Sequence, residues 1–371
     1  MPQRILQIGN YPPPFCGWSV QTKLLVEEIR NRGHVCDVLN LSENRAKKSH
    51  EYTDVQNGFD YLYKLIHFAF RRYRFQVHVN GQSKTGYILA LMAALIGRLS
   101  GSSVALSWRG GLHQKYFPCS KTFARWAYRL LFQLSGKISC NNQQVKEAIE
   151  QYRIRPDRVV AIPAFSMHHV AFRQVLMARE TEIFLASHHP VFFCYVSFRP
   201  EYDLLMLREA MRQFRQKHKR AGFIWVGFPL KEMPAVNEFA GHWQAEERES
   251  LLLLGNLSHD EFLTLLNRSF AYIRTPACDG VSSSILEALA FGVPVVASEN
   301  GSRPHGVITY RAGHATDLCA KLVDMAEQGR QRHRTQMQSD EDNIAKTVDW
   351  LLGHPGAVEE RREESVVHVA Q

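Results

Sequence analysis

Short apolar runs alternate with helical stretches through most of the chain, and this alternation constrains the fold more than any other feature. In the N-terminal part, the apolar runs that we expect to be buried parallel strands are residues 5–8, 35–39, 77–80, 104–108, 137–140 and 159–162. The helices expected with them are residues 21–32, 59–72, 86–100, 121–134 and 143–152. Strands alternating with helices are typical of a doubly wound α/β sheet.

The alternation stops between Pro163 and Pro190 and then restarts. Further strands are expected at residues 191–196, 223–226, 251–254, 271–274 and 295–298, and helices at residues 203–218, 259–267, 283–291 and 316–328. A chain of 371 residues is long enough for two cores. We therefore predict two Rossmann-like doubly wound domains, residues 1–170 and 171–335, with a C-terminal helix and tail at residues 336–371. Two such sheets facing across a cleft bind ligands at the carboxyl ends of their strands.

Composition narrows the classes of protein and of partner. A hydrophobic fraction of 45% and a charged fraction of 22% are those of a globular protein. The net charge of +9 suits an anionic ligand or an acidic membrane surface, but no base-reading motif organises it, so no nucleic-acid partner is expected. The seven cysteines lack a CxxC pair, which favours reduced thiols in the cytoplasm.

Neither a leader, a membrane span nor a metal site is expected. Residues 1–8 lack the apolar region of a signal peptide. The most apolar stretch, residues 87–99, is shorter than the roughly 20 residues that a span requires, so we predict a buried helix there. The histidine pairs 168–169 and 188–189 could bind a metal, but no carboxylate or cysteine shares their spacing, and a solvated linker is favoured.

The segment from Arg274 to Ser298 carries the clearest chemistry, because it predicts a strand, a small-residue loop, a helix and another strand. Uncovered N–H groups at the start of that helix would suit a diphosphate. Any of the serines 282–284 could cap the helix. Asp279 before the loop and Glu287 one turn into the helix would accept hydrogen bonds from sugar hydroxyls. A capped helix with a surface acid explains the same spacing equally well.

This segment resembles the donor-site motif of the family 4 retaining glycosyltransferases, in which two acidic residues eight apart flank a glycine-rich turn. The run LEALAFGVPVVAS is close to that family's usual sequence at this position. The resemblance implies a GT-B fold, with Asp279 touching the transferred sugar and Glu287 holding the ribose of the nucleotide. It also implies that backbone groups of the turn bind the donor phosphates, namely those of Gly280, Val281, Ser282, Ser283 and Ser284.

Weaker resemblances extend over residues 4–328 and imply further site residues. The Pro- and Gly-rich loop after the first strand resembles the family's N-terminal loop. On the acceptor side the resemblance places Gly17, Trp18, Arg109 and His113. On the donor side it places Gly227 and Asn256 in the nucleotide-base loops, Arg303 in a glycine turn, and Arg199 as a cation for the leaving diphosphate.

Four positions depart from the family pattern. Asp279 replaces the usual glutamate, and Tyr202 stands where a lysine is expected, so part of the leaving-group charge depends on Arg303 or another base. Arg109 stands where relatives often have a histidine and cannot act as a base, and Cys16 replaces a glycine. Because of these departures, a catalytically impaired relative of the family remains an alternative.

Two N-terminal stretches, residues 70–75 and 121–134, are basic and aromatic. On the second, Lys121, Arg125 and Arg129 recur along one face of the expected helix. Such a helix either rests on anionic lipid or is a surface helix with its apolar face in the core, and the second interpretation is favoured.

The sequence as a whole predicts a metal-independent retaining glycosyltransferase without a cofactor. It would transfer a hexose or N-acetylhexosamine from a UDP- or GDP-sugar to a glycan or lipid-linked acceptor in cell-surface polysaccharide biosynthesis. We expect it in the cytoplasm, and a location at the inner face of the membrane, with peripheral contact through the N-terminal domain, is a further hypothesis. The alternatives are an impaired sugar-nucleotide-binding scaffold protein and a GT-B sugar-nucleotide epimerase.

Overall fold

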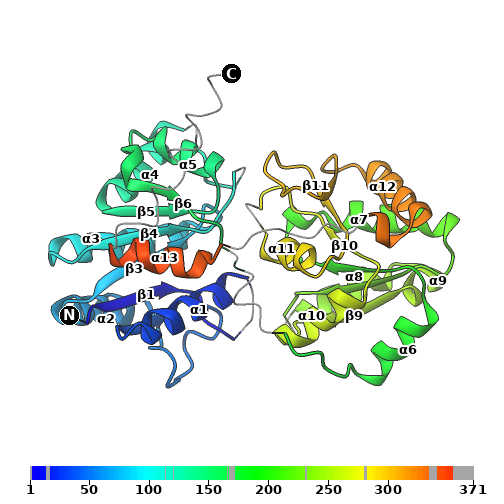
Figure 1. The fold of residues 1–371 in the computed structure, drawn as a ribbon, viewed down its shortest axis with the longest axis horizontal. Coiled ribbons are helices and arrows are strands. Elements are labelled where there is room, and N and C mark those ends of the chain that lie inside the picture. The colour runs from blue at the N-terminus through cyan, green and yellow to red at the C-terminus, as the bar shows by residue number, and fades with distance from the viewer. Residues whose placement is uncertain are drawn as a thin grey trace. The chain divides into compact units, whose positions relative to one another are not determined.

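The computed structural model divides into two compact units, Met1–His169 with Asp340–Gln371, and Val170–Ser339. It describes residues 2–13, 17–112, 114–119, 121–164, 166, 172–229, 232–279, 282–333 and 341–353. Each unit is built on a parallel six-stranded sheet flanked by helices (Figure 1). The predicted fold class, two doubly wound α/β sheets, is confirmed.

The first sheet has the strand order β2-β1-β3-β4-β5-β6. Its strands are β1 (Arg4–Gly9), β2 (Val35–Asn40), β3 (Arg74–Val79), β4 (Val104–Trp108), β5 (Lys137–Cys140) and β6 (Val159–Ala161). One face packs against α2 (Gly58–Phe70), α3 (Lys84–Leu99), α4 (Thr122–Leu134) and α5 (Gln143–Glu150). The other face packs against α1 (Gly17–Asn31) and α13 (Asn343–Leu352).

The C-terminal helix α13 completes the core of the first unit, far from its neighbours in sequence. Figure 1 shows it in red beside the blue and cyan elements of that unit. Its apolar face joins α1 in one buried cluster, and its last turn is held by Lys137 Nζ, which donates to the Trp350 carbonyl at 2.8 Å. The sequence predicted this helix but not its place.

The second sheet has the order β12-β11-β10-β7-β8-β9. Its strands are β7 (Val191–Tyr195), β8 (Gly222–Val226), β9 (Leu251–Gly255), β10 (Ala271–Arg274), β11 (Val295–Ser298) and β12 (Val307–Tyr310). The helices of this unit are α6 (Arg179–Ser187), α7 (Leu204–Lys217), α8 (Met233–Gly241), α9 (Ala245–Glu249), α10 (His259–Arg268), α11 (Ser283–Ala290) and α12 (Ala315–Gln328).

The sequence missed four elements of the second unit: α6, α8, α9 and β12. Helix α6 lies inside the stretch that we read as a linker. Helix α9 has only five residues, and β12 is a four-residue edge strand with three half-exposed side chains, so neither gives a clear period.

The prediction of a buried helix at residues 87–99 is wrong in part. Helix α3 turns small residues toward the sheet, where a Cβ on Gly97 would collide with Val104, while Ile88, Leu95 and Leu99 are exposed. Small side chains let the helix lie close to the sheet, and three of its larger apolar side chains face outward. Among the described residues, no helix has the length and apolar content needed to cross a membrane.

Candidate functional site

The carboxyl ends of β7 and β10 lie side by side where the strand order of the second sheet reverses. Chain connections run from β7 to β8 and β9 on one side and from β10 to β11 and β12 on the other. Doubly wound sheets bind ligands outside the strand ends at such a point. Two residues end these strands, Tyr195 on β7 and Arg274 on β10.

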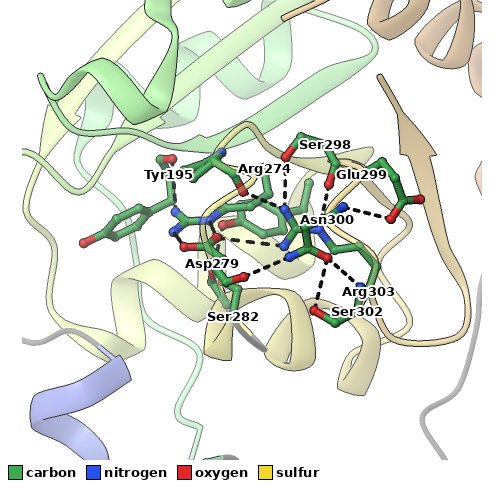
Figure 2. Close-up of polar contacts among 12 residues, drawn as sticks. Tyr195, Arg274, Asp279, Ser282, Ser298, Glu299, Asn300, Ser302 and Arg303 are labelled. Carbon is green, nitrogen blue, oxygen red and sulfur yellow. Dashed lines mark hydrogen bonds and ion pairs between the residues drawn. The ribbon is translucent and has the colours of Figure 1, made fainter. Parts of the chain in front are cut away.

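Arg274 forms a bidentate ion pair with Asp279 in the loop after β10 (Figure 2). Its Nε lies 2.7 Å from Oδ2 and its Nη2 lies 3.1 Å from Oδ1. The guanidinium carbon also lies 5.2 Å from the ring centres of both Tyr195 and Tyr202. Burial alone would lower the pKa of Arg274, but the charges of Asp279, Tyr202 and Tyr272 and the hydrogen bond to Asp279 together outweigh it and raise that pKa well above its usual range. The arginine therefore stays charged.

A second buried arginine, Arg303, approaches the same carboxylate. Its Nη1 lies 3.9 Å from Asp279 Oδ2, while Nε and Nη2 donate to the carbonyls of Ser298 and Pro276 at 2.8 and 2.6 Å (Figure 2). Within the described part of the structure, Nη1 has no hydrogen-bond acceptor. Burial is the main reason that the pKa of Arg303 is lowered. Two guanidinium groups thus surround one carboxylate.

The loop after β11 fixes the loop that carries Asp279. Asn300 Nδ2 donates to the Asp279 carbonyl at 2.9 Å (Figure 2). Asn300 is itself held in a tight turn, because Glu299 Oε1 accepts from the backbone N–H groups of Asn300 and Gly301 at 2.8 and 2.6 Å. Gly301 has a φ of +76°, which a residue with a side chain rarely adopts.

The start of α11 lacks a side-chain cap, which corrects the prediction that a serine caps it. Ser282 occupies the N-cap position, but its hydroxyl hydrogen-bonds to Ser284 at 2.9 Å, and Ser284 also hydrogen-bonds to the Tyr272 hydroxyl at 2.7 Å. Ser283 is the first residue of the helix. The first N–H groups of a helix have no acceptor within it, so this terminus suits an anion. Gly280 and Val281, also predicted here, lie outside the described residues.

Glu287, on the same helix, pairs with His259 at the start of α10. Glu287 is 9% exposed, and its Oε1 lies 2.8 Å from His259 Nε2. Burial lowers the pKa of His259, but its hydrogen bond to Glu287 and the charge of that carboxylate outweigh burial, so the pKa is raised above 6.5. The carboxylate predicted to bind ribose is therefore held in place by a histidine.

The stability that His259 contributes should fall as the pH rises. Because its folded-state pKa lies above the unfolded value of 6.5, its stabilisation is complete below that pH and is lost as the pH passes the folded pKa. We expect His259→Gln to cost on the order of 1 kcal/mol in mild acid and less at alkaline pH. Melting temperatures across this range test it. In a Glu287→Gln background, the cost of His259→Gln should depend much less on pH. A His259→Gln cost that grows as the pH rises would contradict the prediction.

The other predicted donor-side residues, Gly227, Asn256 and Arg199, differ in whether they contact the arginine–aspartate cluster. Gly227 has a φ of +99°, and a Cβ there would collide with the Tyr195 ring. Asn256 is exposed directly after β9. Arg199 is exposed before the 3-10 turn Pro200–Tyr202 and makes no close ion pair in the described structure, so it is not part of the arginine–aspartate cluster.

Sequence reasoning missed the two residues that hold the acids, Arg274 and His259. A signal existed for Arg274, because it ends the otherwise apolar strand AYIR, where a charge needs a partner. His259 gave no such signal, since it follows the capping serine Ser258 in an ordinary helix start.

In the first unit, Arg109 follows β4 and is held by a buried polar network. Its Nε and Nη2 lie 3.1 and 3.0 Å from His78 Nδ1, and its Nη1 donates to Gln21. The other ring nitrogen of His78, Nε2, donates to Gln7 Oε1 at 2.7 Å and so extends the network. Burial lowers the pKa of Arg109 to about 9, and burial with the Arg109 charge lowers that of His78 well below its usual value.

The remaining acceptor-side predictions are only partly described. Gly17 and Trp18 are the first residues of α1. His113 lies outside the described residues, as do His168 and His169. In the part of the chain that the structure describes, no three His, Cys, Asp or Glu side chains gather to hold a metal ion.

The second unit resembles a known protein family. Residues 180–328 match the model of the family described as glycosyl transferases group 1. Glycosyltransferase 1 domain-containing protein 1 of Xenopus tropicalis is 24% identical over 152 residues, which are 41% of this chain and only 42% of that relative. The chain thus spans less than half the length of this relative.

Three solved structures resemble nearly the whole chain. A putative UDP-N-acetylglucosamine 2-epimerase from Listeria monocytogenes has a TM-score of 0.68 at 15% identity, covering 95% of this chain and 96% of that one. HepE from Anabaena in complex with UDP has a TM-score of 0.65 at 15% identity, covering 94% and 95%. A glycosyltransferase from Rickettsia africae has a TM-score of 0.62 at 13% identity, covering 95% and 100%. The chain therefore has the GT-B fold, and its second unit matches the glycosyl transferases group 1 family over residues 180–328.

Proposed function

We propose that the protein is a family 4 retaining glycosyltransferase that moves a hexose or N-acetylhexosamine from a nucleotide-diphosphate sugar to a glycan or lipid-linked acceptor. One observation carries the proposal: Asp279 precedes and Glu287 follows the uncapped start of α11, at the switch point of the second sheet, and Arg274 and His259 hold the two acids. That arrangement offers hydroxyl acceptors on both sides of an anion site.

Each acid has a role that its surroundings support. Arg274 donates two hydrogen bonds to Asp279, and the remaining lone pairs of Asp279 accept hydrogen bonds from hydroxyls of the transferred sugar. Glu287 accepts from the ribose hydroxyls, with His259 fixing its orientation. The N–H groups at the start of α11 bind the diphosphate.

Charge on the leaving diphosphate is offset without a lysine at Tyr202. The guanidinium of Arg274 lies over the Tyr202 ring and so brings a cation to that place from β10. Arg303 adds a second cation, which leaves the cluster of two arginines and Asp279 with a net positive charge. Positioned cations and N–H groups stabilise developing negative charge without a metal ion. Arg199 supplies a further exposed guanidinium beside Tyr202.

UDP is the first nucleotide to test, because HepE, which shares the fold, was solved with UDP and with UDP-glucose. GDP is the second. We further propose that the reaction belongs to cell-surface polysaccharide assembly at the cytoplasmic face of the membrane, as the resemblance to family 4 implies.

The experiment is a thermal-shift panel of UDP-, GDP-, ADP- and CMP-sugars, each beside its free nucleotide. A donor at 100 times its dissociation constant should stabilise the native state by about 2.7 kcal/mol. The stabilising sugar is then incubated with acceptors, and NMR of the product should show a retained anomeric configuration. If no donor stabilises the folded protein, the proposal fails.

Two other outcomes of these assays would support the alternative functions. Donor binding without transfer to a broad acceptor panel would support the impaired scaffold protein, which the ion pairing of Asp279 with Arg274 makes a specific alternative. Epimerised donor formed without any acceptor would support an epimerase, the activity named in the Listeria structure. NMR of the donor alone distinguishes the two.

A further inference from the structure

Large apolar side chains are exposed on three helices on one face of the first sheet. Helix α3 contacts both α2 and α4, and all three bury their inner faces in the same core cluster. Nine of the thirteen large hydrophobic side chains exposed in the described residues belong to these helices, namely Phe59, Tyr63, Ile66, Phe70, Ile88, Leu95, Leu99, Phe123 and Trp126. We call this set the α2–α4 face. Scattered exposed apolar residues are ordinary, but a gathering of this kind marks an interaction surface.

Helix α2 is apolar on both sides. Its inner side buries Tyr61, Leu65 and Phe68. Its exposed residues Phe59, Tyr63, Ile66 and Phe70 follow spacings of four, three and four, which places them along one outer face over the whole helix. A surface helix ordinarily carries polar residues there. This stripe therefore lies outside the buried core of the first unit.

Helix α3 fully buries only small residues, while its large apolar residues are either partly buried against the core (Tyr87, Leu89, Met92 and Ile96) or exposed. Its buried residues are Ala90, Ala93, Ala94 and Gly97, while Ile88, Leu95 and Leu99 are exposed. A helix packed only for the stability of this unit would bury the larger side chains. The three exposed side chains Ile88, Leu95 and Leu99 are therefore available to pack against something outside this unit.

Helix α4 adds two exposed aromatic rings. Phe123 is 80% and Trp126 is 60% exposed, and their ring centres lie 6.5 Å apart in a stacked arrangement. The apolar side of α4 instead buries Tyr128, Leu131 and Phe132. Exposed Trp and Phe beside basic residues are typical of surfaces that enter the headgroup region of a bilayer.

The charges around the α2–α4 face are basic. Residues 84–99 and 122–134 contain no Asp or Glu, and α2 contains only Asp60, which pairs with Lys64 at 2.8 Å. Exposed basic residues on or directly before these helices are Lys84, Arg98, Lys121 and Arg125. An apolar centre with a basic rim complements a surface that is apolar inside and negatively charged at its edge.

We propose that the α2–α4 face docks the first unit onto an anionic lipid bilayer. The basic rim meets acidic headgroups, and the aromatic and aliphatic side chains enter the boundary between headgroups and acyl chains. A second copy of the chain fits less well, because an isologous dimer would bring the same basic residues together. The inference uses only the first unit and does not depend on the proposed glycosyl transfer.

Vesicle flotation of the full chain tests the proposal, with phosphatidylcholine vesicles compared with vesicles containing 30% phosphatidylglycerol. We expect co-flotation with the anionic vesicles, weakened by salt. The pair Phe123→Ser/Trp126→Ser should lower the partition coefficient at least tenfold. Arg98→Gln/Lys121→Gln should lower it about fivefold per charge removed, on anionic vesicles only. Phe70→Ser/Leu99→Ser repeats the apolar test on α2 and α3.

Leu176→Ser/Leu205→Ser is the matched control, because it removes two exposed leucines from the second unit. It should float like the wild type, and circular dichroism should show every variant folded. Absence of co-flotation, or equal flotation of all variants, overturns the proposal. A dimer in solution that Phe123→Ser/Trp126→Ser dissociates, with no vesicle binding, assigns the face to a second copy instead.

Discussion

Replacing Arg274 by methionine is expected to destabilise the second unit by about 3 kcal/mol and to abolish donor binding. Methionine can still fill the space between Tyr195 and Tyr202, but it leaves the Asp279 carboxylate with only Arg303, 3.9 Å away. Removing one partner of a buried ion pair costs about 3–5 kcal/mol, and partial exposure of Asp279 favours the lower end. For a unit of this size the melting temperature should fall by about 6–12 °C, at about 2–4 °C per kcal/mol.

Two further variants distinguish the effect of an unpaired Asp279 carboxylate from a general loss of packing. Arg274→Met combined with Asp279→Asn should recover most of the stability, because no unpaired carboxylate remains, while donor binding stays lost. Arg208→Met is the matched control, since Arg208 also stacks on an aromatic ring and pairs with an acid, at 5.0 Å from Trp243 and 3.0 Å from Glu247. Its side chain is more exposed, so it should cost about 1 kcal/mol. Equal losses for the two arginines would contradict the prediction.

The fold was predictable because each buried parallel strand is a short apolar run between helices. Four of the predicted strands, residues 104–108, 137–140, 271–274 and 295–298, match the observed limits. Strands covered on both faces need apolar residues throughout, which makes them visible in the sequence. Such reasoning fails for α9 and β12, which are too short to show a period.

The acids of the candidate site were predicted from the sequence, but the ion pairs that hold them were not. Asp279 and Glu287 lie eight residues apart on one local segment, whereas Asp279 meets Arg303 from the loop after β11, and Glu287 meets His259 from another helix. Such pairs depend on which strands are neighbours, here β10 beside β11. The serine cap was wrong for a local reason, since Ser282 and Ser284 hydrogen-bond to each other.

The α2–α4 face shows a second limit of sequence patterns. Residues 87–99 have the composition of a buried helix, and the observed exposure arises because Ala93, Ala94 and Gly97 let α3 approach the sheet by its small-residue side. Hydrophobicity alone does not say which side of an apolar helix faces the core.

Replacing Glu287 by alanine is expected to weaken binding of the nucleotide-sugar donor about 10- to 150-fold. The proposed role gives Glu287 charged hydrogen bonds to ribose hydroxyls, and such bonds contribute about 1.5–3 kcal/mol. Titration calorimetry with the stabilising nucleotide measures the change. Glu287→Gln keeps the shape and one acceptor oxygen but loses the charge, so its affinity should fall between those of the wild type and Glu287→Ala.

The control must separate binding from the loss of a buried carboxylate, and Glu247 provides it. Glu247 and Glu287 are both 9% exposed, and each pairs with one basic side chain, Arg208 and His259. Glu247→Ala should therefore lower stability without changing nucleotide affinity. His259→Ala should weaken binding less than Glu287→Ala, because the carboxylate remains and only its orientation is freed. If Glu247→Ala and Glu287→Ala weaken the nucleotide equally, Glu287 acts through the stability of the second unit and does not contact the ribose.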